Sequence, residues 1–190
     1  MSPWALLAAM FAAGAMLAWP LATDWLDWQA EMLVAEPWRA FSAAFVHWSV
    51  RHLLANLAGC AVLAWLGLAA KLPARCAWAW LLAWPLTHIG LLLLPDLQHY
   101  GGLSGVLHAG VAITVVELLF RQGRDRLLGA AIAAGLLLKL LLEQPLGAAM
   151  RQVPGWDIAV VPFAHLSGAI AGLACALLLS INWQGRSLNQ

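Results

Sequence analysis

Apolar stretches separated by short charged or Pro/Gly-containing segments recur along the whole chain. A helix that crosses a bilayer needs about 20 mostly apolar residues, and six stretches approach that length. The expected spans lie near residues 4–22, 52–70, 75–94, 103–120, 127–142 and 162–183. The pattern therefore predicts an all-α membrane protein with six transmembrane helices.

The composition agrees with a membrane protein. Hydrophobic residues make up 63% of the chain and charged residues 10%, whereas soluble domains usually hold about 45–50% and about 25%. Six spans in 190 residues leave room only for short connections. We expect residues 1–190 to form a single membrane domain whose solvent is the lipid bilayer. A cleaved signal peptide is disfavoured because residues 1–4 carry no basic side chain.

Charged side chains are distributed unevenly between the two ends of the expected spans. One end carries most of the basic residues, namely Lys71, Arg75, Arg121, Arg124, Arg126 and Arg186. The other end carries most of the acidic residues, namely Asp24, Asp27, Glu31, Glu36, Asp96 and Asp157. Basic loops stay in the cytoplasm, so we expect both termini there and the segment 23–46 outside. The net charge of +1 gives no indication of nucleic-acid binding.

Tryptophan is abundant, with 12 residues against one tyrosine. Several lie near the ends of expected spans, as an interfacial aromatic belt predicts. These are Trp4, Trp19, Trp25, Trp48, Trp78, Trp156 and Trp183.

A serine between glycines opens the fourth span, in Gly102-Leu103-Ser104-Gly105. Taken alone, a serine in a membrane helix usually bonds only to a preceding carbonyl. His165 opens the sixth span, however, and spans four and six both run inward from the outer face. Ser104 and His165 should therefore lie at similar depth.

Small residues favour a close approach of these two spans. Gly168 and Gly172 follow His165 on or near its face, and Gly105 and Ala109 give the fourth span a comparable smooth side. Close packing would bring the serine oxygen within hydrogen-bond reach of the imidazole, which is the geometry of a nucleophile–base pair. No Asp or Glu has an obvious place as a third member.

His52 and Asn56 are four residues apart and share one face of the second span. Acyl transfer needs donors for the developing oxyanion, and the amide and imidazole N–H groups are suitable. The alternative is an interhelical hydrogen bond, worth about 0.6 kcal/mol on average.

In order and spacing, four motifs resemble those of the rhomboid proteases. They are Trp38-Arg39, His47-x4-His52-x3-Asn56, Gly102-Leu103-Ser104-Gly105 and His165-x-x-Gly168-x-x-x-Gly172. In that family the positions matching Ser104 and His165 form a catalytic dyad, and those matching His52 and Asn56 help to hold the oxyanion. The resemblance implies a six-helix bundle with a water-filled cavity that opens outward. Other matching positions are then expected to shape the site, namely Trp38, Arg39, His47, Gly102 and Gly105.

His108 lies four residues after Ser104, on the same helical face. Familiar rhomboids often carry an aromatic residue there, beneath the catalytic histidine. We expect His108 to pack under His165, and a role as the base in place of His165 is the rival interpretation.

Ser104-Gly105-x-x-His108 in a short chain looks like the rhombosortase branch of the family. That branch is associated with removal of a glycine-glycine-marked C-terminal membrane anchor from exported proteins. The resemblance implies a bacterial-type inner membrane and an active site open to the exterior or periplasm. Alternatives are a general rhomboid protease that cleaves other single-span proteins, or a non-catalytic relative that binds membrane segments.

No cofactor or metal is expected. Six histidines are enough to supply axial ligands to haem in a helical bundle, but that role does not explain a serine between glycines. Zinc-dependent proteolysis is disfavoured because the chain has no His-Glu-x-x-His.

The remaining polar residues of the expected spans have no assigned chemistry. Lys139 is expected to reach toward the interface or to face the bundle, and Glu117 to lie in cytoplasmic water. His88 and His99 have no predicted partner.

Overall fold

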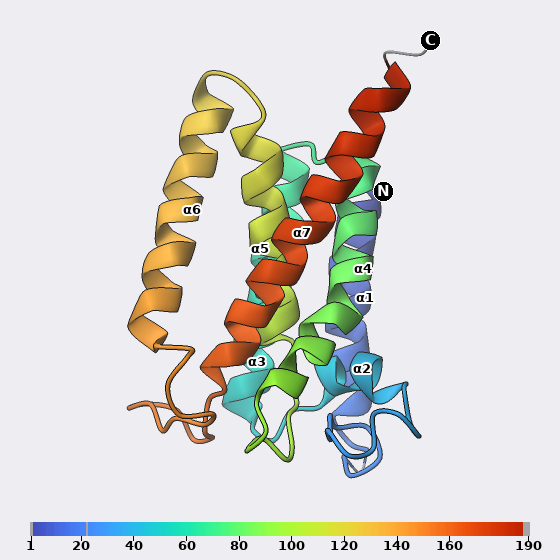
Figure 1. Cartoon of the computed structure of the whole chain (residues 1–190), viewed down its shortest axis with the longest axis vertical. Coiled ribbons are helices and arrows are strands. Elements are labelled where there is room, and N and C mark those ends of the chain that lie inside the picture. Colours follow the sequence, from blue (N-terminus) through green and yellow to red (C-terminus); the bar gives the residue numbers. More distant parts are fainter. Residues whose placement is uncertain (1, 22, 188–190) are drawn as a thin grey trace.

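The structure is a computed structural model that describes residues 2–21 and 23–187, with side-chain surroundings through residue 180. Within this part the chain forms seven α-helices and two 3-10 turns. The elements are α1 (Pro3–Ala18), α2 (Arg39–Ser42), η1 (Ala43–Phe45), α3 (Val50–Ala69), α4 (Ala74–Ile89), η2 (Gly90–Leu93), α5 (Ser104–Leu119), α6 (Arg124–Glu143) and α7 (Pro162–Ser187). The long helices run side by side, and the longer loops gather at the end opposite the start of α1 (Figure 1).

Three segments are long and apolar enough to cross a membrane: Val50–Ala69, Ala74–Leu93 and Pro162–Ser180. The helices α1 and α5 are apolar but shorter, and α6 carries charged residues near both ends. The predicted mostly helical membrane protein is therefore confirmed, while the count of six crossings stays a prediction.

Each of the expected spans falls on one long helix, with shifted ends. The helix α1 ends at Ala18 rather than at residue 22, because Pro20 has no backbone N–H with which to continue the helical hydrogen bonds. The α-helical part of α4 ends at Ile89 and continues as the 3-10 turn Gly90–Leu93.

A cluster of aromatic side chains joins the first helices of the bundle. Trp4 stacks on Trp80 with ring centroids 4.4 Å apart, and Phe11 meets Trp80 edge-on at 5.1 Å. The indole N–H of Trp4 donates to the carbonyl of Leu63 at 2.7 Å, and that of Trp80 to the carbonyl of Val106 at 2.7 Å. The cluster therefore ties α1, α3, α4 and α5 together.

The prediction that Trp4 belongs to an interfacial belt is thus wrong, because this side chain is fully buried. The other predicted belt residues that the structure describes are exposed, namely Trp19, Trp25, Trp48, Trp78 and Trp156. The side chain of Trp183 lies outside the described part.

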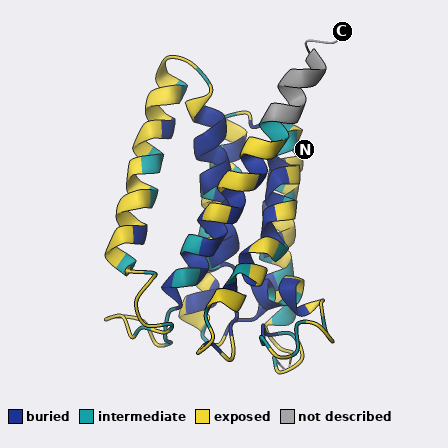
Figure 2. Ribbon diagram, viewed as in Figure 1, coloured by how far each residue is buried: buried dark blue, intermediate teal, exposed yellow. Residues whose placement is uncertain are grey.

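The helix α5 is the centre of the bundle and is buried along most of its length, whereas α6 stands at the edge and is mostly exposed (Figure 2). Small residues let α7 approach α5 closely. A side chain on Gly168 would overlap the carbonyl oxygen of Gly105, and one on Gly172 would lie 2.7 Å from the Cα atom of Ala109. These contacts are the ones that the small-residue pattern predicts.

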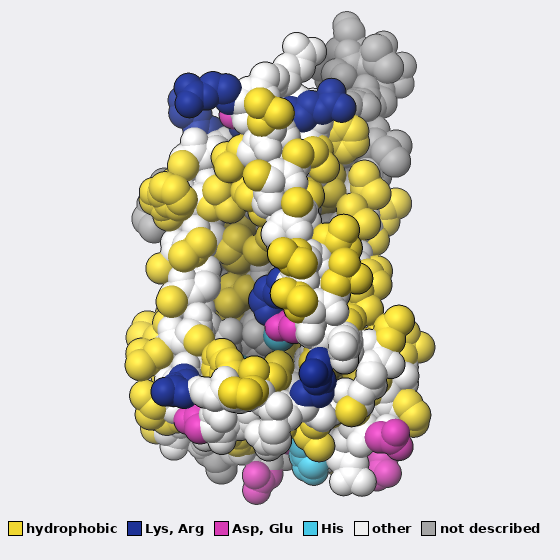
Figure 3. Space-filling view, turned by 90° about the vertical axis from the view of Figure 1, so that its left-hand side faces the viewer, with side chains coloured by type: hydrophobic (Ala, Val, Ile, Leu, Met, Phe, Trp, Pro, Cys, Tyr) yellow, Lys and Arg dark blue, Asp and Glu magenta, His cyan; other side chains and the backbone are white. Residues whose placement is uncertain are grey.

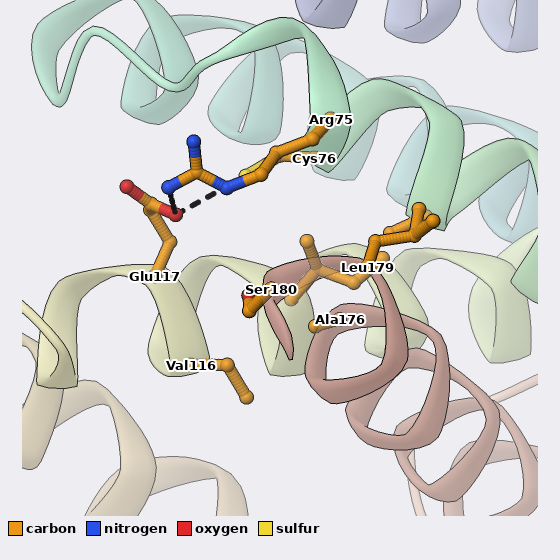
Figure 4. A pocket seen from close by; sticks show the side chains of 9 residues that line it. Arg75, Cys76, Val116, Glu117, Ala176, Leu179 and Ser180 are labelled. Carbon is orange, nitrogen blue, oxygen red and sulfur yellow. Dashed lines mark hydrogen bonds and ion pairs between the residues drawn. The ribbon is translucent and has the colours of Figure 1, made fainter. Parts of the chain in front are cut away.

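Ion pairs fasten the opposite end of α5. Glu117 accepts from Arg75 at 2.7 Å and pairs with Arg121 at 3.3 Å, and Arg121 also donates to the carbonyl of Ala70 at 2.6 Å. Figure 4 shows the Arg75–Glu117 pair beside the small cavity between α4, α5 and α7. Glu117 was expected in water but is buried, because two guanidinium groups make its burial tolerable.

The close contact between α5 and α7 generates a stability prediction. Gly172→Ala should lower the melting temperature, since its methyl group meets backbone that cannot move aside, and overpacking costs about 1–3 kcal/mol. The matched control is Gly135→Ala in α6, where a methyl group meets nothing within 4 Å and alanine gains about 0.5–1 kcal/mol in a helix. Thermal unfolding in detergent compares them, and equal shifts for both variants would contradict the packing account.

Candidate active site

Ser104 is the first residue of α5, and the segment before it fixes its position. The backbones of Trp28 and Tyr100 pair through two hydrogen bonds of 2.8 and 3.0 Å, and the N–H of Gly102 donates to the carbonyl of Ala43 at 2.9 Å. Gly102 has φ +132°, and a side chain there would lie 2.6 Å from the ring of His52. Only glycine fits both demands.

His165 meets the serine from the start of α7. Its Nε2 atom lies 3.0 Å from the Oγ atom of Ser104, and its side chain is buried. Gly168, about one turn after His165, lies against Gly105, the residue after Ser104, and this close approach makes the distance possible. The structure therefore brings together the two residues that the sequence pairs.

A carboxylate also reaches His165, although the sequence pattern assigns no Asp or Glu an obvious place there. An Oε atom of Glu143 is 2.7 Å from the Nδ1 atom of His165. Glu143 is the last residue of α6. Because α6 runs antiparallel to α5 and α7, its last residue lies level with their first ones. Consecutive spans alternate in direction, so the order of the spans alone predicts that the end of α6 lies beside the starts of α5 and α7. This is the signal in the sequence that points to Glu143.

His108 packs against one face of the His165 ring. The two rings are stacked, with centroids 4.2 Å apart and planes inclined by 14°. The Nδ1–H of His108 donates to the backbone carbonyl of Ser104 at 2.6 Å, whereas the Ser104 hydroxyl lies 3.0 Å from Nε2 of His165. This placement favours His165 over His108 as the residue that takes the serine proton.

The helix α3 contributes a second polar group. The side-chain amide of Asn56 donates to Nε2 of His47 at 2.9 Å, and Nδ1–H of His47 donates to the carbonyl of Phe45 at 3.1 Å. Burial lowers the pKa of His47, which keeps the ring neutral and able to accept. The His52 ring lies beside that of His47, with centroids 4.7 Å apart, and its Nδ1 atom has no partner among the described residues.

Several of these side chains border a cavity of about 800 Å³. Its polar lining includes His52, Asn56, Ser104, His108 and His165, and its apolar walls come from α3, α5 and α6. Residues of the connection between α6 and α7 also line it, among them Arg151, Trp156 and Val160. Seen from the side of α6, the surface is hollowed, and acidic, basic and histidine side chains meet at the edge of the hollow (Figure 3). The volume is in the range of about 300–1,000 Å³ that is usual for binding sites.

Residues 34–182 match the profile of the rhomboid domain, which is more than half of the 190 residues. The chain belongs to the rhomboid family.

Relatives of this rhomboid-family chain include enzymes named rhomboid protease GlpG. The protein of Klebsiella pneumoniae (strain ATCC 700721 / MGH 78578) is 31% identical over 174 residues, which cover 86% of this chain and 56% of that protein. The protein of Salmonella newport (strain SL254) is 30% identical with the same coverage. The chain thus spans 56% of the length of these relatives.

Trp38 and Arg39 were expected to shape the rhomboid site, but neither lines the cavity. Trp38 is exposed, and its indole donates to the carbonyl of Trp25 at 3.3 Å. Arg39 is buried and binds Asp27 at 3.0 Å and Glu36 at 2.5 Å. Both residues order the segment that carries Trp28, whose pairing with Tyr100 supports the approach to Ser104. Their connection to the site is therefore indirect.

His88 and His99, for which the sequence predicts no partner, both form hydrogen bonds away from the cavity. The buried His88 donates from Nδ1 to the carbonyl of Ala40 at 2.6 Å. His99 binds Asp27 at 2.6 Å. Neither lines the cavity.

Among the described residues, His108, Glu143 and His165 have potential metal-ligating atoms within 4.8 Å of one another. The lone pairs of an imidazole lie in the plane of its ring. Because the two rings are stacked with nearly parallel planes 4.2 Å apart at their centroids, their lone pairs do not converge on one ion. The arrangement fits hydrogen bonding to the carbonyl and the carboxylate rather than a shared metal.

Proposed function

We propose that this chain is an intramembrane serine endopeptidase with Ser104 as nucleophile and His165 as general base. The observation that carries the proposal is the 3.0 Å separation of Ser104 Oγ and His165 Nε2 at the border of the cavity. Membership of the rhomboid family supports it.

The reaction would proceed through an acyl-enzyme. Ser104 gives its proton to Nε2 of His165 as its oxygen attacks the peptide carbonyl, and the imidazolium then protonates the departing amine. Water, activated by the same imidazole, releases the acyl group. No cofactor enters these steps.

Donors for the oxyanion are present on two helices. One amide hydrogen of Asn56 is used by His47, and the second is left for the oxyanion. His52 lines the same cavity, and the first N–H groups of α5 have no partner within that helix. We assign His52 and Asn56 to this role.

We propose that residues 1–190 form one rhomboid-like domain with six crossings of a bacterial-type inner membrane and both termini in the cytoplasm. The distribution of basic residues supports this orientation, because Arg75 and Arg121 lie at the end of the bundle opposite the cavity. Ser104 then opens to the exterior or periplasm.

As substrate we propose an exported protein held by a C-terminal transmembrane helix and marked by a glycine pair, the substrate class of the rhombosortase branch. The motif Ser104-Gly105-x-x-His108 supports assignment to this branch. A bond just before such a helix lies at the depth of Ser104, and a glycine pair readily unwinds the start of the helix. Val46 and His52 leave no room for side chains on Gly101 and Gly102, which precede Ser104. A substrate chain that passes beside this crowded segment should therefore carry small residues at the cleaved bond.

The first prediction from the proposed function concerns the reacting pair, Ser104 and His165. Ser104→Ala and His165→Ala should each abolish cleavage of a membrane-anchored substrate while the melting temperature stays close to that of the wild type. Ser180→Ala, near the other end of α7, serves as the control and should cleave normally. Activity of Ser104→Ala within tenfold of wild type would refute the assignment.

The second prediction concerns Asn56. Asn56→Ala should lower kcat by about ten- to a thousandfold, the range for a lost oxyanion donor, with little change in KM. His47→Ala removes the same hydrogen bond, which joins the loop before α3 to Asn56, and keeps the amide, so it should retain a higher kcat. Equal losses in both variants would give Asn56 a purely structural role.

The third prediction concerns the substrate. Replacing the glycine pair of the anchor by valines should slow cleavage, and so should moving the pair ten residues deeper into the apolar helix. Mass determination of the new C-terminus reports rate and position together. Cleavage of either variant at the native rate and position would contradict the proposed recognition.

A further inference from the structure

Both ring nitrogens of His165 are engaged, and on opposite sides of the ring. Nε2 is 3.0 Å from the Ser104 hydroxyl, and Nδ1 is 2.7 Å from the carboxylate of Glu143. Serine, histidine and glutamate therefore form one line of hydrogen bonds, contributed by α5, α7 and α6.

The carboxylate is held from several sides. Its other oxygen binds the ammonium group of Lys139. Arg151 donates to the backbone carbonyl of Glu143 at 2.6 Å, and Gln144, in the left-handed conformation at φ 51°, ends the helix there. The side chain is 23% exposed and borders the cavity, so water and small solutes can reach it.

The chemistry of the contact fixes the histidine tautomer. An ionised carboxylate can only accept hydrogen bonds, so the proton of the neutral imidazole must lie on Nδ1. Nε2 then presents a lone pair to the serine hydroxyl. The other charged or titratable neighbours cannot do this, since His108 touches only the face of the ring, and Lys139 and Arg151 contact Glu143 instead.

We propose that Glu143 is a positioning residue of the active site, so that the reacting group is a Ser104–His165–Glu143 triad rather than a dyad. This inference rests on the proposed peptidase function. Glu143 holds the Nδ1–H tautomer of His165 and stabilises the imidazolium that forms when the serine proton is transferred. It takes no proton itself.

The test measures the rate at which a fluorophosphonate probe labels Ser104, which needs no known substrate. Glu143→Ala should slow labelling on the order of 10²- to 10⁴-fold, the upper end being the loss in kcat when the acid of a serine-protease triad is replaced by its amide. Glu143→Asp should retain an intermediate rate. The matched control Glu31→Ala changes an exposed glutamate of an outer loop and should label at the wild-type rate.

Chemical rescue separates positioning from packing. Formate entering the cavity of Glu143→Ala should raise its labelling rate at least tenfold, and should leave wild type and Glu31→Ala unchanged. Slow labelling that neither formate nor Glu143→Asp improves would show that Glu143 only packs, and would overturn the inference.

Two further outcomes keep this inference distinct from the proposed function. If labelling depends on Ser104 but is normal in Glu143→Ala, the triad is refuted and the peptidase proposal stands. If Ser104→Ala is labelled like wild type, the peptidase proposal itself fails.

A measurement on the unmodified protein covers the case in which Glu143→Ala does not fold. In protein with ¹⁵N-labelled histidine, the NMR signals assigned to the neutral form of the His165 ring should show a protonated Nδ1 and an unprotonated Nε2. The opposite tautomer would overturn the inference.

Discussion

The backbone contact between α5 and α7 is the constraint on which the rest of the site depends. Gly168 lies against the carbonyl of Gly105, where no side chain fits, so the two helices are held close at the ends that carry Ser104 and His165. Ser104 and His165 occupy the first turns of these helices, and their separation of 3.0 Å follows from that contact. Aromatic packing around Trp80 and the ion pairs of Glu117 keep α5 in place.

The helix α6 is held differently. Most of its surface is exposed, and only Gly129 and Leu140 are buried. Gly129 lies against α5 near Leu118, and the other end is tied by Glu143 to His165. One wall of the cavity is therefore the least enclosed helix of the bundle, which leaves the hollow open to the side (Figure 3).

Much of this could be predicted from the sequence, because in a membrane protein the signal is strong. The apolar stretches located the long helices, and Ser104 and His165 stood out since polar groups are rare at that depth. Local patterns did not reveal Glu143, because it ends α6, 22 residues before His165, and only the antiparallel course of α6 brings it to the site. Trp4 was misplaced for a related reason, since burial against Trp80 depends on packing between distant helices.

The most direct measurement of the central claim is to locate the phosphonyl group after reaction of the detergent-solubilised protein with a fluorophosphonate. The account predicts that peptide mapping by mass spectrometry finds the adduct on Ser104, and that it disappears when His165 is replaced by alanine. An adduct on a different residue, or unchanged modification of Ser104 without His165, would contradict it.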